Sequence, residues 1–247
     1  MISFNPEQRF IVTGASSGIG EGVALLLNEL GVTVIGIGRN QERLKGMKAK
    51  ARYPENVFLE QKELTEDISG LPAYVKALKD KYGKFSGMAY CAGIGEVSPF
   101  QLWNYEKERR FFDVNYFAPL AMLKGIADRR NNVVGETSCV FIASASALLA
   151  DRGHCSYAGS KAALVTSCRT LAKELTVQRL RVNTVSPTVI RTPMTTSGGD
   201  EYEISQISKY PMGFGEVSDV ANLIVFLLSD KSKWITGQNY VVDCASF

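Results

Sequence analysis

The sequence predicts an α/β fold built on one doubly wound parallel sheet of about seven strands, with helices on both faces. Short apolar runs alternate with segments of helical period along the 247 residues, as expected for βαβ units joined by right-handed crossovers. A glycine-rich turn follows the first apolar run and precedes the first helical segment, which is the arrangement of dinucleotide-binding folds. No linker, low-complexity segment or internal repeat interrupts this alternation in the sequence, so a single domain is expected.

The N-terminal half is predicted to contain four strands and three helices. Each strand is a short apolar run, and the four runs are residues 9–14, 32–38, 56–61 and 85–93. Helix 18–31 has apolar residues at helical spacing and ends at Gly31, a usual helix stop. The charged segment 40–51 is predicted to be a second helix, and residues 66–83 a third that starts near Pro72.

The C-terminal half supplies three further strands, at residues 138–144, 181–187 and 238–244. The helix between the first two of them carries the stretch SYAGSKAAL, and an apolar helix covers residues 219–230. The segment 191–208 is polar, contains paired glycines and has no clear period until its end. It is therefore predicted to be a mobile loop.

Composition and charge exclude several classes of protein. Hydrophobic residues make up 45% and charged residues 21% of the chain, as in ordinary globular proteins. A net charge of +3 is too small to indicate nucleic acid or an anionic membrane as a partner. No apolar run reaches the roughly 18 residues of a membrane helix, and the stretch MISFNPEQRF lacks the apolar core of a signal peptide. A cytoplasmic protein without membrane or nucleic-acid partners is expected.

A metal site is not expected. The chain has five scattered cysteines without a C-x-x-C pair, namely Cys91, Cys139, Cys155, Cys168 and Cys244. Reduced and mostly buried thiols are their expected state. His154 is the only histidine, so a histidine metal site or a Ser-His-Asp triad would depend on this one residue.

The turn TGASSGIG, residues 13–20, has its glycines in the order G-x-x-x-G-x-G. Gly14 allows a tight turn, and Gly18 and Gly20 let the backbone approach a pyrophosphate without a Cβ in the way. The helix N-terminus and the hydroxyls of Ser16 and Ser17 add donors for phosphate. No lysine follows Gly20, so the sequence does not fit the phosphate loop of a kinase or an ATPase. A glycine-rich turn that binds no ligand remains the alternative interpretation.

The stretch SYAGSKAAL places Tyr157 four residues before Lys161. On a helix these two side chains lie on one face, where an ammonium group would favour the phenolate and lower the pKa of the tyrosine. Two exposed residues on a solvated helix would have the same spacing. The pair by itself therefore does not decide between catalysis and a surface contact.

Together, the glycine turn and the Tyr-x-x-x-Lys motif resemble the classical short-chain dehydrogenases/reductases, from about residue 8 to residue 243. The resemblance implies one Rossmann-type NAD(P)-binding domain over residues 1–247. Its cofactor half would cover roughly residues 8–135, and its catalytic and substrate half roughly residues 136–247. It also implies a homotetramer or homodimer that forms through helices near residues 101–125 and 156–177.

The resemblance implies four catalytic residues, which are Asn115, Ser144, Tyr157 and Lys161. Ser144 lies 13 residues before Tyr157, as in the family, and Ser146 is the neighbouring alternative. Tyr157 would exchange a proton with a carbonyl/alcohol pair whose oxygen Ser144 binds. Lys161 would also hold the cofactor ribose, and Asn115 would support Lys161 through a water molecule.

The cofactor-binding residues that the resemblance implies lie mostly after strand ends. They are Gly14, Ser16, Ser17, Gly18, Ile19, Gly20, Arg39, Glu63, Leu64, Cys91, Ala92, Gly93, Tyr157, Lys161, Pro187, Thr188, Val189, Ile190 and Thr192. This sequence departs from the family pattern at four places. Cys91 stands where the family usually has asparagine, Thr188 replaces a glycine, and Cys244-Ala245 replace a Gly-Gly pair. Glu63-Leu64 stand where the family has Asp-Val beside the adenine, which is only an approximate match.

The last residue of the second strand, Gly38, and the residue that follows it, Arg39, favour NADP(H) over NAD(H). An acid at the end of this strand would bind the ribose 2′-hydroxyl of NAD, but Gly38 stands there. Arg39 follows and can bind a 2′-phosphate with its guanidinium, unless it is only a solvated charge. The expected function is an NADP(H)-dependent oxidoreductase that interconverts a carbonyl and an alcohol.

Two other functions stay open. One is a dinucleotide-binding regulator or redox sensor without turnover, although such a protein has no need of all four catalytic residues. The other is a dehydratase or epimerase of nucleotide sugars, which usually has a longer C-terminal substrate domain than this chain allows. The expected substrate pocket is moderately apolar and admits acyl thioesters, sugars, steroids or small ketones. Its wall would comprise Ile94, Gly95, Ser146, Leu148, His154 and Met194.

Overall fold

The computed structural model describes residues 2–195, 210 and 212–246, and these contain one sheet of seven parallel strands. The strand order is β3-β2-β1-β4-β5-β6-β7, so the order reverses between β1 and β4. The strands are β1 (Arg9–Thr13), β2 (Thr33–Gly38), β3 (Val57–Gln61), β4 (Gly87–Tyr90), β5 (Ser138–Ile142), β6 (Arg181–Pro187) and β7 (Asn239–Val242). The prediction of a doubly wound parallel sheet is confirmed.

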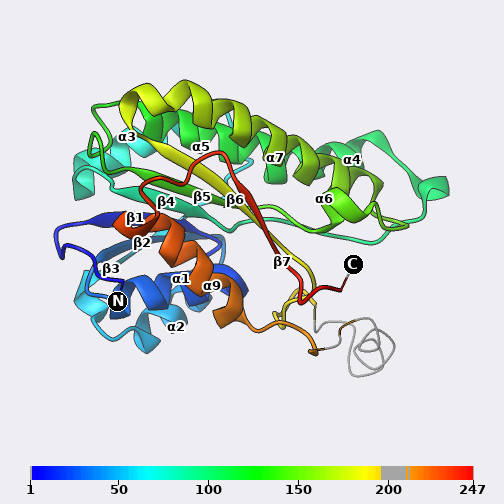
Figure 1. Cartoon of the computed structure of the whole chain (residues 1–247), viewed down its shortest axis with the longest axis horizontal. Helices are drawn as coiled ribbons and strands as arrows, with labels where there is room; N and C mark the ends of the chain where they lie inside the picture. Colours follow the sequence, from blue (N-terminus) through cyan, green and yellow to red (C-terminus); the bar gives the residue numbers. More distant parts are fainter. Residues whose placement is uncertain (1, 196–209, 211, 247) are drawn as a thin grey trace.

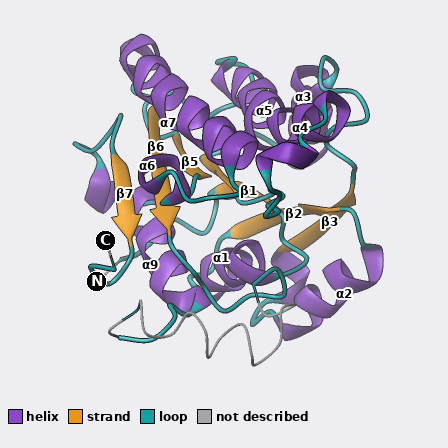
Figure 2. Cartoon of the chain, turned by 90° about the vertical axis from the view of Figure 1, so that its right-hand side faces the viewer, coloured by secondary structure: helices purple, strands orange, loops and turns teal. Residues whose placement is uncertain are grey.

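Helices cover both faces of the sheet (Figure 1). One face carries α1 (Gly18–Glu29), α2 (Gln41–Lys50) and α9 (Val217–Leu228). The other carries α3 (Leu71–Tyr82), α5 (Ala118–Ala127) and α7 (Cys155–Leu175). The shorter helices are α4 (Tyr105–Phe112) and α6 (Ser146–Leu149), with 3₁₀ turns at Pro54–Asn56, Phe100–Leu102, Thr176–Gln178 and Asp230–Ser232. Figure 2 shows the strands between these two layers, with β3 and β7 at opposite edges.

Successive residues of each strand face two separate cores, because side chains alternate across a sheet. In β1, Phe10 and Val12 pack against α1 and α9, whereas Ile11 packs on the side of α3, α5 and α7. All three side chains are fully buried. Burial on both faces explains why the strands appear in the sequence as nearly continuous apolar runs.

On each face of the sheet, one glycine lets two helices approach closely. A Cβ at Gly22 of α1 would collide with Val217 of α9, and a Cβ at Gly125 of α5 would lie 2.6 Å from the Cβ of Val75 in α3. The first contact joins the beginning of the chain to a helix near its end, and the second joins α3 to α5 on the other face of the sheet.

The third predicted helix starts where expected, near Pro72, because α3 begins at Leu71. Residues 66–70, which the predicted segment also included, form a turn in which the Asp67 carboxylate accepts hydrogen bonds from the Ser69 hydroxyl and the Gly70 N–H. The helix expected near residues 101–125 begins only at Tyr105, after the capping residue Asn104. It is interrupted by a π-helical turn at Asp113–Phe117 before α5 begins. Of the predicted mobile loop, residues 196–208 lie outside the described residues.

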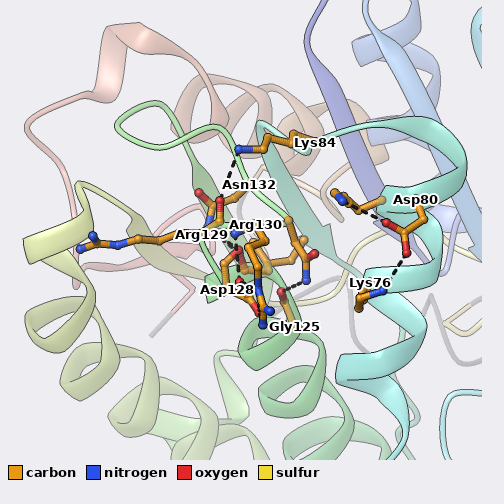
Figure 3. A network of polar contacts seen from close by, with 11 residues as sticks. Lys76, Asp80, Lys84, Gly125, Asp128, Arg129, Arg130 and Asn132 are labelled. Atoms are coloured by element: carbon orange, nitrogen blue, oxygen red, sulfur yellow. Dashed lines mark hydrogen bonds and ion pairs between the residues drawn. The ribbon is translucent and has the colours of Figure 1, made fainter.

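Side chains close the C-terminal end of α5, at the edge where the strands begin (Figure 3). The Asn131 amide donates to the Gly125 carbonyl at 2.9 Å, and the Asn132 amide donates to the Ile126 carbonyl at 2.7 Å. Asp128 forms an ion pair with Arg130 in the same loop. The orphan carbonyls of the helix end are thereby satisfied, and the chain is directed into β5.

Candidate functional site

A cavity of about 280 Å³ lies at the carboxyl ends of the strands, where the strand order reverses between β1 and β4. Ligands of open α/β sheets bind at this kind of position. All the predicted cofactor-binding residues except Val189 line the cavity, and so do Ser144, Tyr157 and Lys161. Residues that are far apart in the sequence therefore meet in one place, as the sequence analysis expected.

The glycine turn after β1 lies directly against the turn after β4. Gly14 has a φ of +68°, and a Cβ there would lie 2.9 Å from the nitrogen of Ala92. The hydroxyl oxygen of Thr13 accepts hydrogen bonds from the N–H groups of Cys91 and Ala92, both at 3.1 Å. The fully buried Thr13 side chain thus joins the two turns through these hydrogen bonds. The sequence analysis did not assign this role to Thr13.

The N-terminus of α1 lines this cavity with its first three residues, Gly18 to Gly20. Ser17 precedes the helix in an extended conformation, and its side chain makes no capping hydrogen bond. A Cβ at Gly20 would collide with the Gly14 carbonyl, so only glycine allows the turn to pack so tightly on the helix. Uncapped N–H groups and the positive end of the helix dipole fit a pyrophosphate. The residues present therefore suit a dinucleotide.

The opposite end of the cavity is formed by the turns after β2 and β3. Arg39 Nη1 lies 3.4 Å from Glu63 Oε2, and Glu63 Oε1 accepts hydrogen bonds from the N–H and the hydroxyl of Thr65. Partial burial raises the pKa of Glu63, but the bonds from Thr65 and the charge of Arg39 outweigh it. The pKa of this carboxyl is consequently below its usual value.

Lys161 is almost fully buried in the second turn of α7, on the same face as Tyr157. Its ammonium donates to the carbonyl of Ile142 at the end of β5, at 2.8 Å. Burial lowers the pKa of Lys161 to about 8, because desolvation penalises the charged form. The side chain is thus fixed at the floor of the cavity and carries its charge at a free-energy cost.

Tyr157 forms a wall of the cavity beside Ser144. Burial raises the pKa of Tyr157, and the hydrogen bond with the Ser144 side chain opposes that rise only in part. The neighbouring protein groups therefore favour the neutral phenol. The lowering of this pKa that the sequence analysis expected would need a further positive charge beside the ring.

Asn115 does not line the cavity but lies behind it, fully buried in the π-helical turn. Its Oδ1 accepts from the Ile94 N–H, and its Nδ2 donates to the Ile94 carbonyl, both at 3.0 Å. Nδ2 also donates to the Ser160 hydroxyl at 3.2 Å, and this hydroxyl donates to the Tyr157 carbonyl at 2.7 Å. Ser160 therefore connects Asn115 to α7, and the sequence analysis missed it.

The expected substrate pocket is only partly assembled. Ile94 and Met194 line the cavity, whereas Gly95, Ser146, Leu148 and His154 do not. Leu148 points outward from α6 with 55% of its surface exposed. His154 precedes α7 and lines a separate small depression beside Phe111 and Trp103.

Val189, unlike the other predicted cofactor-binding residues, lies off the cavity, and its carbonyl accepts a hydrogen bond from the Gly215 N–H.

Within the described ranges, no group of three or more His, Cys, Asp or Glu side chains could hold a metal ion. In the same ranges, no helix is long and apolar enough to cross a membrane.

Known proteins resemble this chain along nearly its whole length. The family model described as Enoyl-(Acyl carrier protein) reductase matches residues 14–244. The D-erythrulose reductase of Gallus gallus is 33% identical, over 96% of this chain and 94% of its own length. The 3-oxoacyl-acyl-carrier-protein reductase FabG of Thermotoga maritima is 32% identical, over 94% of this chain and 95% of its own. A short-chain type dehydrogenase/reductase from Mycobacterium ulcerans has a solved structure with a TM-score of 0.88 and 30% identity, covering 99% of this chain and 91% of that one.

Proposed function

Because the chain belongs to the short-chain dehydrogenase/reductase family of oxidoreductases, we propose that it interconverts a small carbonyl compound and its alcohol with NADP(H). One observation carries the proposal. Ser144, Tyr157 and Lys161 line the same cavity as the glycine turn after β1. A group that can donate a proton and a site suited to a dinucleotide are thus next to each other, as carbonyl reduction requires.

The cavity offers distinct positions for the parts of the cofactor. The turn at Gly14 and the N-terminus of α1 would hold the pyrophosphate, and Arg39 would bind the 2′-phosphate. Lys161 would hold the nicotinamide-side ribose. When bound, NADPH would supply the hydride that is added to the carbonyl carbon.

The protein's own groups would handle the oxygen and the proton. A hydride that reaches the carbonyl carbon leaves negative charge on the oxygen, and the Ser144 hydroxyl would stabilise it by a hydrogen bond. Tyr157 would give its phenolic proton to this oxygen. Burial keeps the phenol neutral, which suits the direction of reduction. In the direction of oxidation, Lys161 and a positive nicotinamide would favour the phenolate.

The experiment follows NADPH absorbance, and separately NADH absorbance, with a panel of carbonyl compounds. The panel includes a ketose such as D-erythrulose and a 3-oxoacyl thioester, because relatives of this chain are named for both kinds of substrate. We expect turnover with NADPH, and a loss of about a hundredfold or more in kcat for Tyr157→Phe with the NADPH Kd unchanged. Tyr116→Phe is the control, since this hydroxyl contacts Ser167 and lies off the cavity.

Two results would contradict the proposal. If Tyr157→Phe turned over as fast as the wild type, the phenol would not be the proton donor. If the wild type bound NADPH tightly and reduced no compound of the panel, a dinucleotide-binding regulator would be the better description.

We also propose that the chain forms a homotetramer or homodimer, as membership of this family implies. Light scattering of the purified protein measures this directly, and a mass near the 27.1 kDa of one chain would contradict it.

A further inference from the structure

Arg39 and Glu63 form an ion pair across the end of the cavity where the sequence places the 2′-phosphate. The two side chains come from the turns after β2 and β3, and both line the cavity. The pair is 3.4 Å apart, with 63% of the Arg39 side chain and 41% of the Glu63 side chain exposed. Both groups are therefore accessible to a bound molecule as well as to each other.

The pair is held from both sides. Glu63 Oε1 accepts hydrogen bonds from the Thr65 N–H at 3.2 Å and the Thr65 hydroxyl at 2.9 Å, which leaves Oε2 facing Arg39. On the other side, the Gln61 amide donates to the Arg39 carbonyl at 3.0 Å and fixes the backbone of this residue. Glu63 consequently cannot swing away from the guanidinium without breaking its own bonds to Thr65.

The other cation at this end is also matched by a carboxylate. Lys62 lines the cavity next to Glu63, and its Nζ lies 3.4 Å from Glu66 Oε2. Of these two carboxylates, Glu63 lines the cavity whereas Glu66 does not. A phosphate that enters this end therefore meets the Glu63 carboxylate directly beside the Arg39 guanidinium.

We propose that Glu63 is a specificity-determining residue that limits the preference of this chain for NADPH over NADH. The inference rests on the proposed cofactor site. A 2′-phosphate carries close to two negative charges, so it must share the Arg39 guanidinium with a carboxylate that repels it. NADH has a hydroxyl at this position and is not repelled. The same carboxylate therefore weakens NADPH binding and leaves NADH binding nearly unchanged.

The test is the Kd of NADPH and of NADH, measured by titration calorimetry for the wild type, Glu63→Gln and Glu66→Gln. Glutamine keeps an acceptor for Thr65 and removes the charge. We expect Glu63→Gln to bind NADPH about three- to tenfold more tightly and NADH within twofold of the wild type. Glu66→Gln is the matched control, because this carboxylate pairs with Lys62 but does not line the cavity, and it should change either Kd by less than about twofold.

Ionic strength provides a second readout. Raising the salt concentration screens charges that are exposed to solvent, so the difference in NADPH affinity between Glu63→Gln and the wild type should shrink. A difference that persists at high salt would mean that the substitution acts through shape, and it would overturn the proposal.

Other outcomes separate this inference from the proposed function. Weaker NADPH binding in Glu63→Gln would mean that the carboxylate serves to position Arg39, and equal changes for both cofactors would mean a contact with the shared adenosine. Either result overturns the inference and leaves the proposed function standing. If the wild type bound neither cofactor, the proposed function would fail, and this inference with it.

Discussion

Gly93 lies close to both Asn115 and Lys161. A Cβ at this residue would lie 3.2 Å from Asn115 Oδ1 and 3.4 Å from Lys161 Nζ. The distance to Asn115 is shorter than an ordinary van der Waals contact of carbon, so a larger residue would push against the Asn115 amide. Ser160 acts in the same region, since its hydroxyl joins the Asn115 amide to the backbone of Tyr157.

We predict that Ser160→Ala lowers kcat about tenfold while the NADPH Kd changes little. Without the Ser160 hydroxyl, the Asn115 amide loses its hydrogen bond to α7, and Tyr157 is held less firmly. The measurement is steady-state kinetics together with NADPH titration. Ser167→Ala removes a hydroxyl of the same helix that hydrogen-bonds to the Tyr116 hydroxyl instead of Asn115, and this variant should keep the wild-type kcat. An equal loss of kcat in both variants would speak against a specific role of Ser160.

The sequence identifies some of these residues and not others for a physical reason. Tyr157 and Lys161 are four residues apart on one helix, so their proximity follows from helical geometry alone. The contact between Asn115 and Ser160 spans 45 residues, and the hydrogen bonds that Thr13 accepts span 78 and 79. Such contacts depend on how the elements pack, and a local pattern contains no signal for them.

Among the elements, the end of α9 is held by a half-buried arginine at the start of β6. Arg181 Nη1 donates to the Leu227 carbonyl at 2.8 Å, and Nη2 donates to the Ser229 carbonyl at 2.9 Å. Burial lowers the pKa of Arg181 to about 10, because desolvation disfavours the charge. Cations are favourable at helix C-termini, and this one satisfies carbonyls that would otherwise be orphaned.

Replacing Arg181 by methionine should therefore destabilise the chain by about 2–4 kcal/mol, since buried carbonyls lose their donors. Urea unfolding followed by circular dichroism measures the free energy of unfolding. Arg129→Met replaces an exposed arginine in the loop after α5, and it should cost less than about 0.5 kcal/mol. Similar free energies for the two variants would show that the bonds of Arg181 contribute little.

At this scale the sequence predicts where most elements lie but not how they begin or are interrupted. The seven strands were found because burial on both faces makes each of them an apolar run. The start of α3 near Pro72 was predicted, but the turn around Asp67 ahead of it was not, because that turn depends on side-chain hydrogen bonds. The π-helical turn at Asp113–Phe117 was missed because the side chain of Asn115 binds outside its own helix.

In the whole molecule, the cofactor half and the catalytic half share one sheet. β4 lies in the first half and β5 in the second, and they pair directly from Gly87 with Ser138 to Tyr90 with Phe141. α9 belongs to the catalytic half by sequence, yet it packs against α1. We therefore propose that residues 1–247 form one domain whose two halves, 8–135 and 136–247, do not fold independently.

The fragment of residues 1–135 should consequently show no cooperative thermal transition, because β4 lacks its partner and α1 lacks α9. The full chain should unfold in a single transition that coincides by tryptophan fluorescence and by circular dichroism. A sharp transition of the fragment, or two separate transitions of the full chain, would contradict the proposal.

The contact between Gly22 and Val217 has a consequence for synthesis on the ribosome. α1 leaves the exit tunnel long before α9 exists, and at about 5–20 residues per second the delay is roughly 10–40 s. Throughout this time the apolar face of α1 has no helix to cover it (Figure 1, blue and orange). The nascent chain is thus most prone to aggregation during its own translation, and chaperones that act on emerging polypeptides should raise its yield more than those that act after release.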